Sequence, residues 1–193
     1  MKNILVINGH PNLSSFNAAL FGAYVQGARA SGAQVDELVI ARLQFNPNLQ
    51  YGYQKRMDLE PDLLQAWEKI QAADHLVWLH PVWWGGLPAI TKGFIDRLFL
   101  PGMAFKYRAN SIWWDKLLQG KTAHIISTLD QPGWFYYWFF GNPSVNQLKK
   151  ATLEFCGVKV KRVSYIGPIR GTKPEKLEWW LKKVEKLGKS LKL

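Results

Sequence analysis

The sequence contains a single cysteine, Cys156, among its 193 residues. One thiol cannot form a disulfide within the chain, and it cannot build a multi-cysteine metal site. Disulfide-stabilised folds are therefore excluded, and the composition fits a reducing compartment. Cys156 follows a helix-like segment and precedes a glycine, so we expect it to be a small buried packing residue.

Long apolar runs are also missing. No stretch approaches the roughly 18 consecutive apolar residues that are needed to span a bilayer. The apolar run at 4–7 is too short for the core of a signal peptide, and no small-residue cleavage pattern follows it. The longest aromatic run, 134–140, is likewise too short to cross a membrane. We therefore expect a soluble, cytoplasmic protein.

Acidic residues are few. The chain has 14 Asp and Glu against 25 Lys and Arg, a formal net charge of +11. Such an excess can be a solvated surface that favours solubility, or it can attract phosphorylated ligands or an acidic membrane surface. We expect no nucleic-acid partner, because no nucleic-acid-binding motif accompanies the charge. Much of the excess lies late in the chain, including the helix-like segment 173–192.

Short aliphatic runs alternate with amphipathic segments of helical length. The expected strands are 4–7, 35–40, 75–79, 122–128 and 158–166, and the expected helices are 16–30, 61–73, 88–99, 144–155 and 174–189. This alternation predicts an α/β three-layer sandwich in which a five-stranded parallel sheet has helices on both faces. We expect residues 1–193 to form one domain.

Open sheets of this kind bind ligands beyond the carboxyl ends of their strands. The loop 10–17 follows the first strand and lacks both the G-x-G-x-x-G fingerprint and the phosphate loop of nucleotide-binding proteins. It instead places His10, Ser14, Ser15 and Asn17 at a helix N-terminus, whose free N–H groups and partial positive charge suit a phosphate. The alternative is that Ser14 or Ser15 merely caps the helix.

Two further loops follow later strands. In loop 81–88, Trp83 and Trp84 are followed by Gly85 and Gly86 between two prolines, an arrangement in which an aromatic wall and exposed amides can border a planar heterocycle. The alternative is that one tryptophan belongs to the core. The loop after the fourth strand runs into seven consecutive aromatic residues at 134–140. A core helix is one interpretation, but these side chains cannot all face inward, so we expect some at a pocket, a lid or a subunit interface.

We expect no metal site and no hydrolytic triad. The four histidines have no metal-ligand spacing. The nucleophile elbow of the α/β-hydrolases is also absent from the sequence.

Several motifs occur in order along nearly the whole chain. They are His10-x-x-x-Ser14-Ser15-Phe16-Asn17, Phe45-Asn46-Pro47, Ala73-Asp74 followed by Pro81-x-x-Trp84-x-Gly86-x-Pro88-Ala89, Lys92-Gly93-Phe94-Ile95-Asp96-Arg97-Leu98-Phe99, Ala104-Phe105-x-Tyr107 and Phe155-Cys156-Gly157. Together they resemble the NAD(P)H:quinone oxidoreductases of flavodoxin-like fold, the DT-diaphorase group and its short bacterial relatives.

The resemblance implies a flavin-dependent enzyme and a role for each matching residue. The cofactor-binding residues would be His10, Ser14, Ser15, Phe16 and Asn17 at the phosphate-bearing tail, Pro81, Val82, Trp83, Trp84 and Gly85 beside the isoalloxazine, and Ser127 and Thr128 along its opposite edge. Phe105 and Tyr107 match positions that form the substrate pocket in the family's dimers. Tyr136 or Tyr137 would be the catalytic residue that stabilises the reduced flavin.

Two departures from the family pattern are visible. Leu129 and Asp130 stand where relatives commonly have glycines, which puts ring-edge contacts of that loop in doubt. Relatives also place a histidine downstream of the tyrosine, but no histidine follows His124.

The resemblance further implies hydride transfer from NAD(P)H through the flavin to a quinone-like acceptor, in a homodimer. The larger relatives favour FAD as the cofactor, whereas some short ones use FMN, and the basic excess favours NADPH over NADH. Three alternatives remain: a flavodoxin-type electron carrier, a flavoprotein regulatory partner of a membrane transporter, and a flavin-free binding module. A peripheral contact with a membrane or a transporter would suit the basic surface and the aromatic run.

Overall fold

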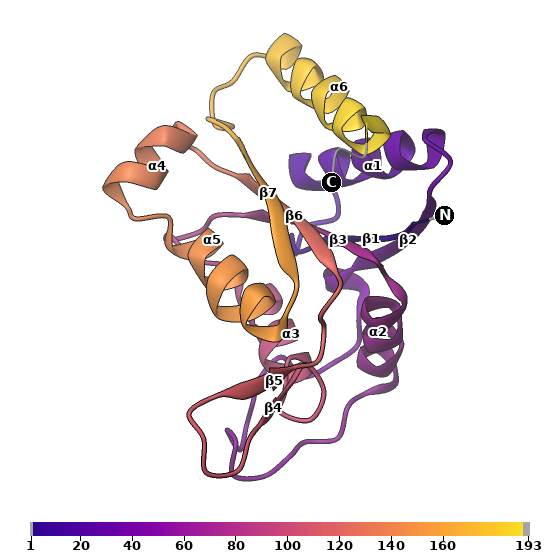
Figure 1. Ribbon diagram of the computed structural model, residues 1–193. Helices are drawn as coiled ribbons and strands as arrows, with labels where there is room; N and C mark the ends of the chain where they lie inside the picture. The colour runs from indigo at the N-terminus through magenta and orange to yellow at the C-terminus, as the bar shows by residue number, and fades with distance from the viewer. Residues whose placement is uncertain (1, 191–193) are drawn as a thin grey trace.

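The computed structural model describes residues 2–190. Five parallel strands form one sheet in the order β2-β1-β3-β6-β7 (Figure 1). They are β1 (Asn3–Asn8), β2 (Gln34–Val39), β3 (His75–Pro81), β6 (Thr122–Thr128) and β7 (Lys159–Ile166). The prediction of a five-stranded parallel sheet is therefore confirmed.

Helices cover both faces of the sheet, as predicted. One face carries α1 (Phe16–Ala30) and α6 (Pro174–Ser190), and the other carries α2 (Pro61–Ala72), α3 (Ala89–Leu98) and α5 (Pro143–Leu148). The two layers are visible on either side of the strands in Figure 1. None of the helices within residues 2–190 is long and apolar enough to cross a membrane.

The central strands are apolar on both faces because both faces are covered. In β1, Leu5 and Ile7 pack into the cluster with α2, α3 and α5, whereas Ile4 and Val6 pack against α1 and α6. Strands buried in this way read as continuous aliphatic runs rather than as alternating patterns. This is why the sheet can be predicted from the sequence.

The helices α1 and α6 approach each other closely through two glycines. A Cβ atom on Gly188 would lie 2.3 Å from the carbonyl oxygen of Tyr24, and one on Gly27 would lie 2.0 Å from that of Glu185. Side chains at these positions would force the helices apart, so glycine is required at both.

The structure differs from the prediction in its shorter helices and strands. The predicted helix 144–155 is α5 followed by a π-helical segment, η2 (Lys149–Glu154). A 3-10 turn, η1 (Ile40–Arg42), follows β2. Two short strands, β4 (Phe105–Tyr107) and β5 (Trp114–Lys116), form an antiparallel pair. The helix α4 (Gly133–Phe139) contains most of the aromatic run. Elements this short carry too few residues for periodicity to reveal them.

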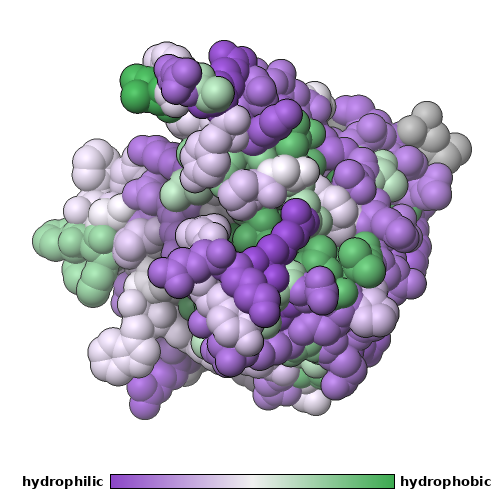
Figure 2. All heavy atoms as spheres, turned by 90° about the horizontal axis from the view of Figure 1, so that it is seen from below, coloured by the Kyte–Doolittle hydropathy of each residue, from purple (hydrophilic) through white to green (hydrophobic). Residues whose placement is uncertain are grey.

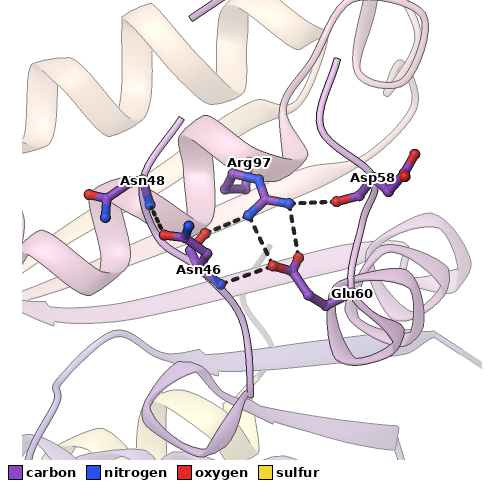
Figure 3. Close-up of polar contacts among 5 residues, drawn as sticks. All are labelled: Asn46, Asn48, Asp58, Glu60 and Arg97. Carbon is purple, nitrogen blue, oxygen red and sulfur yellow. Dashed lines mark hydrogen bonds and ion pairs between the residues drawn. The ribbon is translucent and has the colours of Figure 1, made fainter. Parts of the chain in front are cut away.

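Arg97 in α3 is buried and fixes the loop between η1 and α2 (Figure 3). Its Nη2 lies 2.9 Å from Oε2 of Glu60, and its Nη1 lies 3.1 Å from Oε1 of the same carboxylate. Nη1 also donates to the carbonyl of Asn46 (2.5 Å), and Nη2 donates to that of Asp58 (2.7 Å). The guanidinium thus donates hydrogen bonds to three separate residues of this loop.

Two of the sequence motifs meet at this junction. Besides the bond from Arg97 to Asn46, a Cβ atom on Gly93 would lie 2.5 Å from Cβ of Pro47, so the loop lies directly on α3. The Phe45-Asn46-Pro47 motif and the block 92–99 therefore lie together and attach this loop to α3.

Candidate functional site

A pocket lies at the carboxyl ends of β1, β3 and β6. It is lined by His10, Ser15, Phe16, Asn17, Pro81, Val82, Trp83, Thr128, Leu129, Asp130 and Ile169. The loops after the first, third and fourth strands of the predicted order meet here, at the edge where ligands bind in open α/β sheets. Eight of these eleven residues are among the predicted cofactor-binding residues.

The N-terminus of α1 forms one wall of the pocket. Ser15 caps the helix, because its Oγ accepts the N–H of Ala18 at 3.2 Å. The N–H groups of Phe16 and Asn17 have no partner within the helix, since the first turn never does. Capping by Ser15 and anion binding by the adjacent amides are therefore compatible. Ser14 is exposed and lies outside the pocket wall.

Asn17 presents an unpaired acceptor at the pocket. Its side chain is 2% exposed, and Nδ2 donates to Oγ1 of Thr128 at 3.3 Å. Its Oδ1 is buried and has no hydrogen-bond partner among the described residues. Buried acceptors without a partner are uncommon in folded proteins. Asn17 therefore fits a ligand that brings a donor, such as a hydroxyl group, to this wall.

His10 also lines the pocket, where its ring contacts that of Trp83. The two rings meet edge to face with their centroids 5.3 Å apart. Burial lowers the pKa of His10, so the ring is neutral near pH 7. Its Nδ1 accepts the N–H of Asn12 at 2.9 Å, which leaves the proton on Nε2. His10 can therefore donate one hydrogen bond from Nε2 to a ligand.

The loop after β3 forms a tight turn. Trp83 and Gly86 exchange both backbone hydrogen bonds, at 3.1 and 2.9 Å. The central residues Trp84 and Gly85 both have positive φ, 50° and 75°, as a type I′ turn requires. A tryptophan in this conformation is strained by about 1–3 kcal/mol. The turn holds the Trp84 side chain fully in solvent beside the pocket.

Tyr136 in α4 supports this turn from behind. Its hydroxyl donates to the carbonyl of Gly85 and accepts the N–H of Ser144, both at 2.9 Å. Burial raises the pKa of Tyr136, so the hydroxyl keeps its proton. Nε2 of His80 lies 3.0 Å from Oγ of Ser144 and 3.1 Å from Oγ of Ser127, and burial lowers the pKa of His80 to about 3. A chain of neutral polar groups thus runs from β6 to the turn.

This series of hydrogen-bonded polar groups distinguishes predicted site residues that line the pocket from predicted site residues that lie behind it. Ser127 is fully buried and faces His80 rather than the pocket, whereas Thr128 lines the pocket. Of the two predicted catalytic tyrosines, Tyr136 already uses its hydroxyl for two hydrogen bonds, and Tyr137 is 51% exposed. No local pattern indicates the role of His80, since a histidine near the end of a buried strand is compatible with many structures.

Phe105 and Tyr107 lie outside the pocket. They line a separate hollow between α3, η2 and the β4–β5 pair, together with Lys92, Asp96 and Phe155 among others. Lys92 Nζ and Asp96 form an ion pair there at 2.6 Å. A single chain does not bring Phe105 and Tyr107 to the pocket.

Three lining residues were missed by the sequence analysis as binding residues. Leu129 and Asp130 follow Thr128 directly, and Asp130 Oδ1 accepts the N–H of Arg170 at 3.1 Å. Ile169 reaches the pocket because its N–H donates to the carbonyl of Leu129 at 2.9 Å. Its position after the last strand was an available signal, because all parallel strands end at the same edge.

Other chemistry has little support in the part of the chain that the structure describes. Within residues 2–190, no three His, Cys, Asp or Glu side chains are grouped so that they could hold a metal ion. Cys156 is buried, and burial raises the pKa of its thiol to about 12. A thiol that keeps its proton is a poor nucleophile.

Comparison with known sequences gives consistent relatives. A family model described as flavodoxin-like fold matches residues 2–187. NAD(P)H dehydrogenase [quinone] 1 of Rattus norvegicus is 27% identical over 214 residues, which cover 96% of this chain and 77% of the relative. YcaK of Escherichia coli (strain K12), named as an uncharacterized NAD(P)H oxidoreductase, is 31% identical over 174 residues, covering 86% of this chain and 83% of the relative.

Solved structures are also similar to this chain. Smu.1420 of Streptococcus mutans has a TM-score of 0.80 and 32% identity, covering 97% of this chain and 99% of the other. An FMN-dependent NADH-azoreductase of Bacillus anthracis, solved in complex with FMN, has a TM-score of 0.73 and covers 99% of both chains at 16% identity. At that identity the second likeness shows the fold alone.

Proposed function

The chain belongs to the flavodoxin-like fold family, and from that premise we propose that it is a flavin-dependent NAD(P)H:quinone oxidoreductase. The name of the rat relative supports NAD(P)H and a quinone as the substrates, and the name of the Escherichia coli relative supports NAD(P)H. The observation that carries the proposal is the pocket itself. Free amides of a helix N-terminus, the unpaired buried Oδ1 of Asn17 and an aromatic turn meet there at the carboxyl edge of the sheet.

The phosphate-bearing tail of the flavin would bind at the start of α1. The backbone N–H groups of Phe16 and Asn17 and the Nε2–H of His10 supply donors of the kind that phosphates require. The Oδ1 of Asn17 would accept a hydrogen bond from a hydroxyl of the tail. Asp130 is the acidic side chain of the pocket, and its carboxylate favours the donor-rich sugar part over the phosphate.

The isoalloxazine ring would lie against the Trp83–Gly86 turn. The turn's own hydrogen bonds use the N–H groups of Trp83 and Gly86, which leaves those of Trp84 and Gly85 for the ring edge. Tyr136 fixes the carbonyl of Gly85 and so orients these amides before the ligand binds. Preorganised donors stabilise charge more effectively than donors that must first turn.

The bound flavin would supply the redox chemistry, accepting hydride from NAD(P)H and passing two electrons to a quinone. The protein's part is to bind, orient and stabilise charge. We assign the donor toward the reduced ring to Tyr137, because the hydroxyl of Tyr136 is already committed to Gly85 and Ser144.

Substituting the two tyrosines separately tests this assignment. Tyr136→Phe leaves the buried N–H of Ser144 unpaired, so we expect unfolding to become easier by about 1–3 kcal/mol and flavin affinity to fall. Tyr137→Phe removes a half-exposed hydroxyl and should change stability by less than about 0.5 kcal/mol. It should slow flavin reduction by NAD(P)H in stopped-flow measurements. An unchanged rate in Tyr137→Phe would remove Tyr137 from the mechanism.

FAD is our proposed cofactor and FMN the alternative. FAD is favoured by the resemblance to the larger quinone reductases, whereas the solved Bacillus anthracis azoreductase binds FMN. Both carry the phosphate that the loop 10–17 fits. The mass of the flavin released from the purified protein by heat decides between them.

A homodimer is proposed because one chain leaves Phe105 and Tyr107 in a separate hollow. If they belong to a substrate pocket, a second copy must bring them there. Light scattering during size-exclusion chromatography measures the mass directly, and a monomer at assay concentration would refute this part of the proposal.

Steady-state kinetics with a water-soluble quinone test the activity. We expect NAD(P)H-dependent quinone reduction with parallel double-reciprocal lines, because one site serves both substrates in turn. Purified protein that binds neither FAD nor FMN would indicate a flavin-free binding module. Flavin without rapid quinone reduction would indicate an electron carrier or a regulatory partner of a membrane transporter.

A further inference from the structure

His80 is a polar side chain in an otherwise apolar part of β3. The four residues before it, 76–79, are apolar, and His80 is itself fully buried beside Pro81 of the pocket wall. Burial lowers the pKa of His80 to about 3, so the ring is neutral and acts only through hydrogen bonds. Its Nδ1 has no hydrogen-bond partner among residues 2–190. Any role of this ring therefore depends on the contacts of Nε2.

The Nε2 atom of His80 joins α5 to the sheet. It lies 3.0 Å from Oγ of Ser144, in the first turn of α5, and 3.1 Å from Oγ of Ser127 in β6. Val145 and Leu148 pack the rest of α5 into the core. A helix of six residues gains little stability from its own backbone bonds. The contact with His80 therefore fixes the start of α5 relative to β3.

Ser144 connects His80 to the turn beside the pocket. Its backbone N–H donates to the hydroxyl of Tyr136, and that hydroxyl donates to the carbonyl of Gly85, both at 2.9 Å. The carbonyl belongs to the peptide that follows Gly85, next to the peptide whose N–H would face the flavin. Three hydrogen bonds thus link His80 to the turn.

The hydroxyl of Tyr136 is held by its partners rather than by its own helix. α4 stands out from the body at the left of Figure 1, and Figure 2 shows hydrophobic residues projecting at the same edge. Tyr136 is the one buried residue of α4, and the other aromatic side chains of this helix are exposed or partly exposed, so α4 is not a core helix. Since so little of α4 is packed, the position of the hydroxyl depends on Ser144 and, through Ser144, on His80.

We propose that His80 is a positioning residue for the flavin-facing amides of Trp84 and Gly85, and that it acts through Ser144 and Tyr136. The inference rests on the proposed function. Donors that are held in place stabilise the negative charge of the reduced ring better than donors that must first turn. Loss of the contact between His80 and Ser144 should therefore favour the oxidised flavin and lower the midpoint potential of the bound cofactor.

Potentiometric titration of the purified protein, loaded with FAD or FMN, measures this effect separately from turnover. His80→Phe keeps a planar ring but removes both contacts of Nε2. We expect flavin reduction to become about tenfold less favourable, which is a fall of about 30 mV for a two-electron couple. The amide of His80→Gln can reach the same serines, so this variant should stay within about threefold of the wild type.

His75→Phe is the matched control. His75 is also buried, at the opposite end of β3, and its Nδ1 lies 2.8 Å from Oγ1 of Thr122. We expect this variant to lose stability as His80→Phe does, while its flavin potential stays at the wild-type value. Equal shifts of the potential in the two variants would reflect general destabilisation and would overturn the proposal.

Ser144→Ala tests the route from His80 to the turn. It removes Oγ but keeps the N–H that binds Tyr136, so it should lower the potential as His80→Phe does, and it serves alone if His80→Phe fails to fold. Because residues that act through one contact are not additive, His80→Phe/Ser144→Ala should shift the potential no further than His80→Phe. Additive shifts would show that His80 acts by another route, against the proposal.

Amide NMR spectra of the flavin-free protein separate this inference from the proposed function. The resonances of Trp84 and Gly85 should move in His80→Phe and stay in place in His75→Phe. If they stay in place in both variants while the wild type reduces quinones, His80 does not position the turn and only this inference fails. If they move in His80→Phe but the wild type binds neither FAD nor FMN, the proposed function fails, and the role of His80 toward a flavin fails with it.

Discussion

Replacing Ser15 with aspartate is expected to leave a folded protein that binds flavin about a hundredfold more weakly. Aspartate caps helices as well as serine does, so the bond to the N–H of Ala18 and the start of α1 are retained. The new carboxylate, however, lies where the flavin phosphate would bind. Two unit charges about 5 Å apart repel by roughly 3 kcal/mol at an effective dielectric constant of about 20, which is a factor of about a hundred.

The matched control is Ser15→Asn, which also caps the helix but adds no charge. We expect its flavin affinity to stay within about threefold of the wild type. Fluorescence titration of the apoprotein with FMN and FAD measures the affinity, and thermal unfolding checks the fold. If the aspartate variant binds flavin as tightly as the asparagine variant, Ser15 is only a cap and the phosphate site lies elsewhere.

Substitution of Arg97 with alanine is expected to lower the free energy of unfolding by about 3 kcal/mol. Arg97 is 1% exposed, and its loss would strand the carboxylate of Glu60 and two backbone carbonyls, those of Asn46 and Asp58. Since Glu60 is 29% exposed and keeps some hydration, the effect should fall at the lower end for a broken buried pair. Urea unfolding followed by circular dichroism provides the measurement.

An exposed ion pair supplies the comparison. Arg29 and Glu37 lie closer together, at 2.7 Å against 2.9 Å for Arg97 and Glu60, but they are 57% and 39% exposed. Arg29→Ala should therefore cost less than about 1 kcal/mol. Equal losses in the two variants would show that burial of Arg97 has no energetic consequence.

The same pair predicts a pH dependence. Burial alone would raise the pKa of Glu60, but hydrogen bonds from the N–H of Asn46 and from Arg97 outweigh it and hold the pKa below its usual value. A carboxylate with a lowered folded-state pKa stabilises the fold above its unfolded pKa of about 4.3, and this contribution is lost as the pH falls through the folded-state value. The difference in stability between wild type and Arg97→Ala should therefore narrow in acid.

The sheet and the position of the site follow from strong local signals. Ile4, Leu5, Val6 and Ile7 are apolar without interruption because both faces of β1 are covered, and that pattern is readable without a structure. The loops 10–17 and 81–88 both follow strands of the parallel sheet, and His10 of the first contacts Trp83 of the second. Both loops lie at one site because the carboxyl ends of parallel strands meet at the same edge of the sheet.

The finer assignments depended on contacts between residues distant in sequence. Ser127 and Thr128 are neighbours in a strand, so they face opposite sides of the sheet, and only one of them can line the pocket. Likewise, Tyr136 and Tyr137 are equivalent in sequence, and the bonds to Gly85 and Ser144 alone distinguish them. The partners of His80 lie 47 and 64 residues away, and no local pattern encodes them.

The central claim is that the pocket between His10 and Thr128 holds a flavin that NAD(P)H reduces and a quinone reoxidises. Anaerobic titration of the purified protein, loaded with FAD or FMN, tests it most directly. We expect one equivalent of NADPH to bleach the visible flavin absorbance and one equivalent of quinone to restore it. Both steps should be retained in Ser15→Asn, whereas Ser15→Asp, which binds flavin about a hundredfold more weakly, should retain little flavin to bleach. A wild-type protein that takes up no flavin, or whose flavin stays oxidised under excess NADH and NADPH, would contradict the claim.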